Sequence, residues 1–200
     1  MRWDNLFDDL ESQLEHELTA EDVDLRAEEE RLRLSRLSLR DRIVSLHRAH
    51  EADSDFALRV FLGNGEPVVV RPTALGRDWF AADLIGDGAR NRQCIVPIAT
   101  IAGLALTRNQ VVQSLDGIPG ESERSSLSTR LSLAFVLRDL CRRRSAVELE
   151  TTLGTLRGTI DRVGRDHIDL AMHEQGTPRR ESAITQSRVV PLSQICLVRI

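Results

Sequence analysis

The sequence contains no lysine and no tyrosine, so all 27 of its basic residues are arginines. Any contact with an anionic partner would therefore be made by guanidinium groups, which can bind bidentately and can stack. Aromatic residues make up only 4% of the chain, but 41% of the residues are hydrophobic. This share is typical of a globular protein and excludes a chain that is disordered throughout. Two hundred residues suffice for one medium domain or two small ones.

Cysteine is also scarce, because the chain has only Cys94, Cys141 and Cys196, with no C-x-x-C pair. An odd number of widely spaced cysteines indicates reduced thiols in a cytoplasmic protein. The N-terminus becomes acidic within four residues, which is the opposite of a signal peptide. The longest apolar run, residues 95–106, is too short to span a bilayer. We therefore expect a cytoplasmic protein that does not associate with membranes.

Known catalytic motifs are missing as well. The chain has no G-x-S-x-G, no phosphate-loop glycine cluster and no H-E-x-x-H. The glycine-rich segments 63–65 and 86–88 precede no predicted helix, so hairpin turns explain them better than a phosphate site. His47 and His50 have no acidic or cysteine motif nearby that would complete a metal site. We predict that the protein is not an enzyme and binds no cofactor.

What the sequence does contain is an internal repeat. Three segments of the first half recur in the same order in the second half. The pairs are 36–39 and 130–133 (RLSL in both), 76–84 and 164–170 (GRDWFAADL and GRDHIDL), and 95–101 and 189–195 (IVPIATI and VVPLSQI). Two copies are too few for a solenoid, so the chain is interpreted as a duplicated small domain.

Each copy is predicted to be a helix followed by about five short strands, which gives an α+β fold. Alternating apolar residues and turn-forming glycines define the strands. The predicted strands are 56–62, 68–70, 79–84, 94–98 and 101–106 in the first copy, and 147–149, 156–163, 167–172, 188–192 and 195–200 in the second. The predicted divisions are an acidic helical arm (1–34), a first helix and barrel (35–106), a linker rich in turn formers (107–124), and a second helix and barrel (125–200).

Residues 153–170 (LGTLRGTIDRVGRDHIDL) resemble the first signature of the Sm-like (LSm, Hfq-type) small barrels, which are relatives of the SH3-like barrels. Gly158 lies at mid-strand, where a barrel needs a sharp bend without a side chain. The resemblance covers most of residues 35–106 and 126–200 and implies two tandem small β-barrels. The last two strands carry a Val-Pro pattern in place of the Arg-Gly or Lys-Gly pair with which Sm-like proteins grip a base. The chain also resembles a family of actinobacterial proteins with the same Gly-x-Asp-Trp and Val-Pro-Leu elements.

The first 30 residues hold 12 acidic residues and two arginines, so this segment has a net charge of −10 and the other 170 residues have +6. Apolar residues recur there at spacings of three and four, as in an amphipathic helix. These residues are Trp3, Leu6, Phe7, Leu10, Leu14 and Leu18. The apolar stripe either docks on the protein's own body or binds a groove on a partner.

Residues 21–50 are predicted to form one highly charged helix that packs on its own domain in its second half. Leucines recur in it every seven residues, at Leu25, Leu32, Leu39 and Leu46. The companion positions are charged, so the pattern does not define a continuous coiled-coil seam. Dimerisation through this helix is an alternative.

Two groups of arginines are the best candidates for nucleic-acid binding, because clustered arginines release counterions from phosphate backbones. They are Arg142, Arg143 and Arg144 at the end of the second helix, and Arg179 and Arg180 in a polar insert. His167 replaces Trp79 in the repeat and either fills a barrel or lies at its rim, where it could stack on a base.

We predict a non-enzymatic binding or scaffold protein with two small barrels, whose acidic arm or barrel surface contacts a protein partner or a second copy. The alternative is an RNA- or DNA-binding regulator that uses the arginine clusters and is gated by the acidic arm, which competes for the basic surface.

Overall fold

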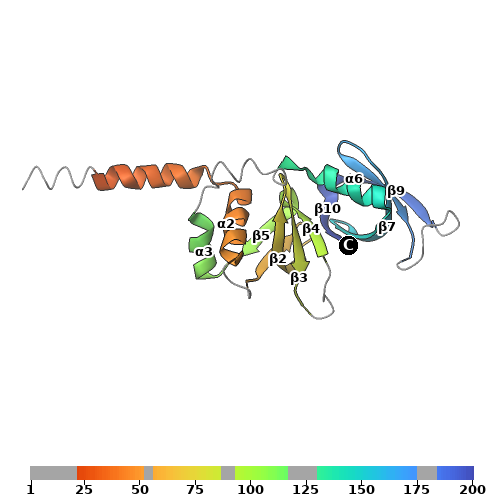
Figure 1. Cartoon of the computed structure of the whole chain (residues 1–200), viewed down its shortest axis with the longest axis horizontal. Coiled ribbons are helices and arrows are strands. Elements are labelled where there is room, and N and C mark those ends of the chain that lie inside the picture. The colour runs from red at the N-terminus through yellow and green to blue at the C-terminus, as the bar shows by residue number, and fades with distance from the viewer. Residues whose placement is uncertain (1–21, 52–55, 87–92, 117–129, 175–183) are drawn as a thin grey trace, which may run out of the picture. The chain divides into compact units, whose positions relative to one another are not determined.

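The computed structural model describes residues 22–51, 56–86, 93–116, 130–174 and 184–200 (Figure 1). The chain divides into two compact units, Met1–Ser38 and Leu39–Ile200. In the first unit, residues 22–35 form a helix with ion pairs along its surface, Arg31 to Glu28 at 3.4 Å and Arg33 to Glu30 at 2.6 Å. The predicted docking residues Trp3, Leu6, Phe7, Leu10 and Leu14 lie outside the described residues.

The described residues of the second unit form ten strands and the helices α2 (Leu39–Glu51), α3 (Arg108–Leu115) and α6 (Leu133–Arg143), which confirms the predicted α+β class. The strands of the first repeat are β1 (Leu58–Leu62), β2 (Pro67–Leu75), β3 (Trp79–Leu84), β4 (Gln93–Pro97) and β5 (Ile101–Ala105). Those of the second are β6 (Ala146–Thr151), β7 (Gly154–Val163), β8 (His167–Met172), β9 (Gln186–Pro191) and β10 (Ile195–Arg199). A short 3-10 turn joins the last two strands of each repeat, η1 (Ile98–Thr100) and η3 (Leu192–Gln194).

All ten strands belong to one antiparallel sheet with the order β5-β1-β2-β3-β4-β10-β6-β7-β8-β9. Within each repeat the last strand pairs with the first, and the first four strands follow in sequence. The repeats are joined because β4 of the first pairs with β10 of the second. The sheet does not close on itself among the described residues, since β5 and β9 form its two outer edges. Two separate barrels are therefore not confirmed.

The two repeats agree in register as well as in strand order. In the first repeat the β2–β3 pairing shifts by one residue between Pro72 and Ala74. In the second, the β7–β8 pairing shifts at the equivalent place, between Ile160 and Arg162. A bulge increases the local twist and bends the strand that carries it. The internal repeat that the sequence predicts is therefore also a repeat of backbone geometry.

The buried side chains form two clusters, one for each repeat, but each cluster includes residues from the other repeat. The first contains Cys196 and Leu197 of β10, and the second contains Trp79 and Ile95 of the first repeat. Burial raises the pKa of the Cys94 thiol to about 12, and Cys94, Cys141 and Cys196 are all free cysteines. The two cores are therefore interlocked at the β4–β10 pairing.

Three of the helical predictions differ from the structure. The predicted helix over 21–50 is broken at residues 36–38, and the predicted second helix is interrupted at residues 131–132, so that α6 begins at Leu133, while residues 125–129 lie outside the described residues. The predicted linker contains α3, whose start is fixed by a capping box between Thr107 and Gln110. Helix α3 packs against α2, where the Arg42 Nη2 donates to the Ser114 Oγ at 2.8 Å (Figure 1). No helix within the described ranges is long and apolar enough to cross a membrane.

Candidate functional site

The predicted arginine cluster at the end of α6 lies beside two acidic residues. Arg142 and Arg143 both pair with Asp139, each at 2.6 Å, and Arg144 pairs with Asp161 at 3.1 Å. Hydrogen bonding from Arg142, together with the charge of Arg143, holds the pKa of the Asp139 carboxyl below its ordinary value. The three arginines thus share two carboxylates and do not form a purely basic patch. Arg179 and Arg180 lie outside the described residues.

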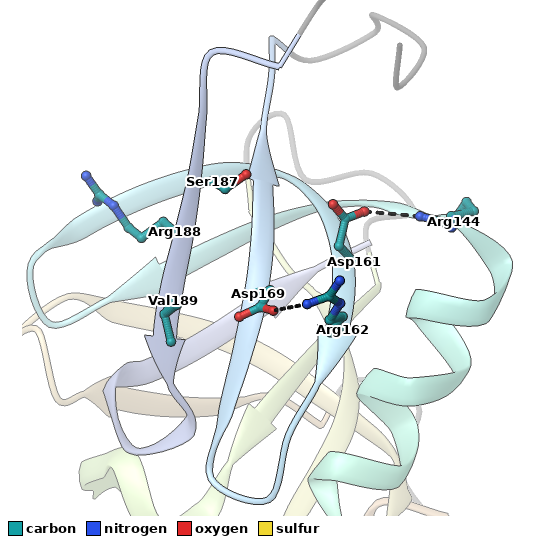
Figure 2. Close-up of a pocket in the computed structure, with 7 residues that line it drawn as sticks. All are labelled: Arg144, Asp161, Arg162, Asp169, Ser187, Arg188 and Val189. Carbon is teal, nitrogen blue, oxygen red and sulfur yellow. Dashed lines mark hydrogen bonds and ion pairs between the residues drawn. The ribbon is translucent and has the colours of Figure 1, made fainter. Parts of the chain in front are cut away.

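A hollow of about 470 Å³, here called the edge hollow, opens beside β9 (Figure 2). It is lined by Arg144, Asp161, Arg162, Asp169, Ser187, Arg188 and Val189. Figure 2 shows the side chain of Arg162 directed toward Asp169, which it approaches to 3.9 Å, whereas Arg188 extends away from them. The apolar part of this surface is Val189, whose side chain is 64% exposed on the outer strand.

The repeated Gly-Arg-Asp segment of the first repeat holds the start of α6. The Trp79 indole Nε1 donates to the Leu131 carbonyl at 3.0 Å, and the Arg77 amide donates to the same oxygen at 2.9 Å. The Asp78 carboxylate accepts from the Leu133 amide at 2.8 Å. The side chain of Ser132 makes no capping hydrogen bond, so a carboxylate of the other repeat takes over this task. This contact and the β4–β10 pairing are together called the joint.

A second hollow, the joint hollow, has a volume of about 670 Å³ and is lined by residues of both repeats. Its lining includes Arg77, Arg138 and Arg165 with a single carboxylate, that of Asp78, 3.7 Å from Arg77. Arg138 donates to the Gly164 carbonyl at 3.4 Å. Sequence reasoning did not select these arginines, although two of them lie in the Gly-Arg-Asp segments that define the repeat. With three arginines and one carboxylate in its lining, the joint hollow carries an excess of positive charge.

His167 occupies the position of Trp79 in the second repeat but has a different environment. Its side chain is 45% exposed, and its Nδ1 lies 2.8 Å from the Asp166 carboxylate. Hydrogen bonding with His167 lowers the pKa of Asp166. The described sheet does not close into a barrel, so the choice between a barrel interior and a barrel rim for His167 stays a prediction. His173, by contrast, is buried and bonded to Thr159 at 2.8 Å.

No family model, curated protein or solved structure matches this chain. Within the described ranges, no group of three or more histidine, cysteine, aspartate or glutamate side chains is placed to hold a metal ion.

The remaining clustered charges form an ion-pair network across β10, β6 and β7. Arg199 contacts Glu148 at 2.6 Å and also Glu150, and Arg157 contacts Glu148 at 2.6 Å. Burial alone would raise the pKa of Glu148, but hydrogen bonds from Arg157 and Arg199 outweigh it, and the pKa is lowered. The network connects β10, which forms part of the joint, to β6 and β7, so its charges stabilise the pairing of these three strands.

Proposed function

We propose that this protein is a non-enzymatic binding or scaffold protein in which two small β-barrels, one for each repeat, carry an acidic helical arm that docks on a protein partner. The main support is that the repeated segments of the sequence lie together in the structure. The RLSL segment before α6, the Gly-Arg-Asp segment before β3 and the Val-Pro strand β4 all meet at the joint. The repeated segments thus hold the two repeats together as one unit, to which the acidic arm is attached.

The barrel part of the proposal rests on strand order and curvature. In each repeat the fifth strand pairs with the first, and the second strand carries a one-residue bulge, at Thr73 in β2 and at Asp161 in β7. Bulges are the device by which a short sheet bends enough to curl toward closure. Two such curled sheets that share the β4–β10 pairing would form paired small barrels.

The arm part of the proposal rests on the apolar stripe from Trp3 to Leu14 and on exposed leucines in the helix over 22–35. Leu25 and Leu32 are 61% and 49% exposed. A partner groove that accepts an amphipathic helix would cover such residues and would favour basic groups around its rim, given the charge of −10 on residues 1–30.

The arm is tested by site-specific photo-crosslinking of the full chain in its native cell. We expect a photoreactive residue at Phe7 or Leu14 to give a discrete crosslinked protein, because both positions lie on the apolar stripe. The same residue at Asp9, on the polar face, is the matched control and should give none. Leu10→Asp should remove the product, and Asp8→Asn should leave it. Equal products from both faces, or no product at all, would contradict partner docking by the arm.

A second candidate function is RNA or DNA binding, which the joint hollow favours over the cluster at the end of α6. Arg77, Arg138 and Arg165 meet one carboxylate there, whereas Arg142 and Arg143 share Asp139. Ser132 and Ser193 also line this hollow, and their hydroxyl groups could donate hydrogen bonds to phosphate. The acidic arm would compete with nucleic acid for this surface and so act as a gate.

The two candidates are separated by fluorescence anisotropy with single-stranded RNA and DNA at low and moderate salt. If nucleic acid binds, Arg165→Ala should weaken binding roughly tenfold and reduce the salt dependence, because a charge-assisted hydrogen bond to phosphate is lost. Arg143→Ala is the matched control and should have little effect. A chain without residues 1–30 should bind more tightly. Absence of binding by either form at low salt would remove this candidate and leave the scaffold.

A further inference from the structure

Each repeat has two edge strands, its fourth and its fifth. The joint pairs the fourth strand of the first repeat with the fifth strand of the second, and the other two edge strands lie at the two ends of the sheet. Strand β4 pairs with β10, and by the repeat β9 corresponds to β4 and β5 corresponds to β10. Strands β9 and β5 are the outer edges of the described sheet. We propose that the β9 edge of one chain binds the β5 edge of a second copy and so reproduces the joint between molecules. This inference does not depend on whether the arm docks on a partner.

The backbone pairing of the joint fixes the register to expect. In the joint, Val198 lies opposite Ile95, and Arg199 lies opposite Cys94. The Ile200 amide donates to the Gln93 carbonyl at 3.0 Å. The pairs at 198 and 200 therefore exchange hydrogen bonds, and the pair at 199 lies between them as a closer pair without hydrogen bonds.

The repeat converts this register into a specific set of contacts between two copies. The match of 95–101 with 189–195 makes Ile95 equivalent to Val189, and makes Val198 equivalent to Leu104. Leu104 of one copy would then lie opposite Val189 of the other, and Ala105 opposite Arg188. Leu104 and Val189 are both aliphatic, as are Val198 and Ile95 in the joint. Arg188 gains space opposite the small side chain of Ala105.

Exposure differs sharply between the used and the unused edges. In the joint, Ile95 is 3% exposed and Val198 is fully buried, whereas Val189 is 64% exposed on β9. Leu104 on β5 is half-buried. An outer strand with unpaired backbone groups and an exposed β-branched side chain is a template for another strand. Pairing with β5 of a second copy would give Val189 the environment that Ile95 already has.

The loop contact of the joint also has its counterpart at the free end. Asp78 and Trp79 hold the RLSL segment before α6, and the equivalent residues of the second repeat are Asp166 and His167. Asp166 has an 86% exposed side chain, and the ring of His167 can donate a hydrogen bond where the indole of Trp79 does. The segment that they would hold is present letter for letter at 36–39, before α2.

The helix that follows each RLSL segment shows the same contrast. Leu133, the first residue of α6, is 6% exposed because it lies in the joint, and its equivalent Leu39, the first residue of α2, is 37% exposed. In the proposed assembly, the Leu39 amide of one copy donates to Asp166 of the other. The edge hollow lies on the same face as Val189, and it provides the space that this end of the second copy would fill.

At two equivalent positions the second repeat is more polar than the first, so the contact between copies would be more polar than the joint. The second repeat has His167 where the first has Trp79, and it has Asp169, which is paired with Arg162, where the first has Ala81. Polar and charged residues on an outer strand weaken pairing and make it reversible. We therefore expect an assembly that depends on concentration and salt. Because its two surfaces differ, it continues head to tail and closes into a ring or extends as a chain of copies.

The assembly is tested by sedimentation velocity of the full chain over a range of protein concentrations. As the protein concentration rises, the measured mass is expected to exceed that of one chain. The Val189→Asp variant should remain monomeric at every concentration. Leu153→Asp is the matched control, because Leu153 is 94% exposed in the β6–β7 turn, away from both edges, and this variant should assemble like the wild type. Far-UV circular dichroism confirms that both variants fold. A monomer at every concentration, or assembly unaffected by Val189→Asp, would overturn the proposal.

The register is tested by disulfide trapping between two variants in a Cys141→Ser background, since Cys94 and Cys196 are buried. A chain with Ala105→Cys, mixed with one carrying Arg188→Cys, should give a heterodimer on mild oxidation, because closely opposed strand residues suit a disulfide. Ala105→Cys mixed with Leu153→Cys is the control, and its heterodimer should form at least tenfold more slowly. Equal rates would show that the edges meet in another way and would contradict the proposal, as would capture of a different peptide strand by β9.

Discussion

Replacing Trp79 with alanine is expected to lower the free energy of unfolding by about 3–5 kcal/mol, the usual cost of removing a large aromatic side chain from a core. Trp79 belongs to the first repeat but is 8% exposed within the core of the second. Its loss would open a cavity at the joint and would leave the Leu131 carbonyl without the indole donor. Urea denaturation followed by far-UV circular dichroism measures the change.

Two further variants divide this effect into its parts. Trp79→Phe retains most of the packing and loses the hydrogen bond to Leu131, so we expect a cost of about 1–2 kcal/mol. Phe135→Ala on α6 is the control, because Phe135 is 52% exposed, and its cost should be within about 0.5 kcal/mol. If Trp79→Ala cost no more than Phe135→Ala, the buried Trp79 side chain would not stabilise the joint.

Replacing Gly158 with alanine is expected to destabilise the protein by about 3 kcal/mol, at the upper end of the cost of overpacking. A Cβ atom at this position would lie 2.1 Å from the Ala171 carbonyl oxygen on the neighbouring strand. The obstacle is the backbone of β8 where it pairs with β7, so it cannot rotate away as a flexible side chain would. The same denaturation measurement applies.

The chain offers a matched control for this substitution. Gly103 also lies in a strand, but a Cβ atom there would meet only the ring of Phe61 at 3.9 Å, an ordinary contact. Gly103→Ala should therefore be neutral, or slightly stabilising because alanine restricts the unfolded chain more than glycine does. Equal effects of the two substitutions would show that the close approach of β7 to β8 is not what requires glycine at 158.

The strands could be predicted from the sequence because their signals are local. Alternating apolar residues, turn glycines and the two Val-Pro segments place nine of the ten described strands to within two residues. The exception is β2, which continues to Leu75 although the sequence predicts its end at Val70. The glycine required at 158 could also be predicted from its position in the middle of a strand. The first repeat has Val70 at the equivalent position, so only the second repeat has a glycine in the middle of its second strand.

The helix starts could not be predicted, because their causes are distant in sequence. Leucine and arginine around Leu131 suit a helix, and α6 nevertheless begins at Leu133, where Asp78 supplies the capping carboxylate from 55 residues away. The short helix α3 has a local signal, Thr107 followed by Gln110, but it lies in a stretch dominated by turn formers. Such a weak signal is outweighed by its surroundings when only the sequence is considered.

The candidate site shows the same division between local and distant causes. A run of three arginines is visible in the sequence, but Asp161, which pairs with Arg144, comes from another strand. The joint hollow brings Arg77 of one repeat to Arg165 of the other, and no local pattern predicts which edges of two similar sheets will meet. The pairing of β4 with β10 is the long-range contact that brings the lining of the joint hollow together.

The exchange of buried residues between the two cores has a consequence for the history of the chain. A newly duplicated domain consists of two copies that can each fold alone, and either copy can be lost without harm to the other. Here β10 supplies Cys196 and Leu197 to the first core, while Trp79 and Ile95 complete the second. Each half completes the core of the other, so we expect the two halves to unfold in one cooperative transition. Deletion of one copy would leave the other with an incomplete interior, and we therefore expect neither half to fold alone.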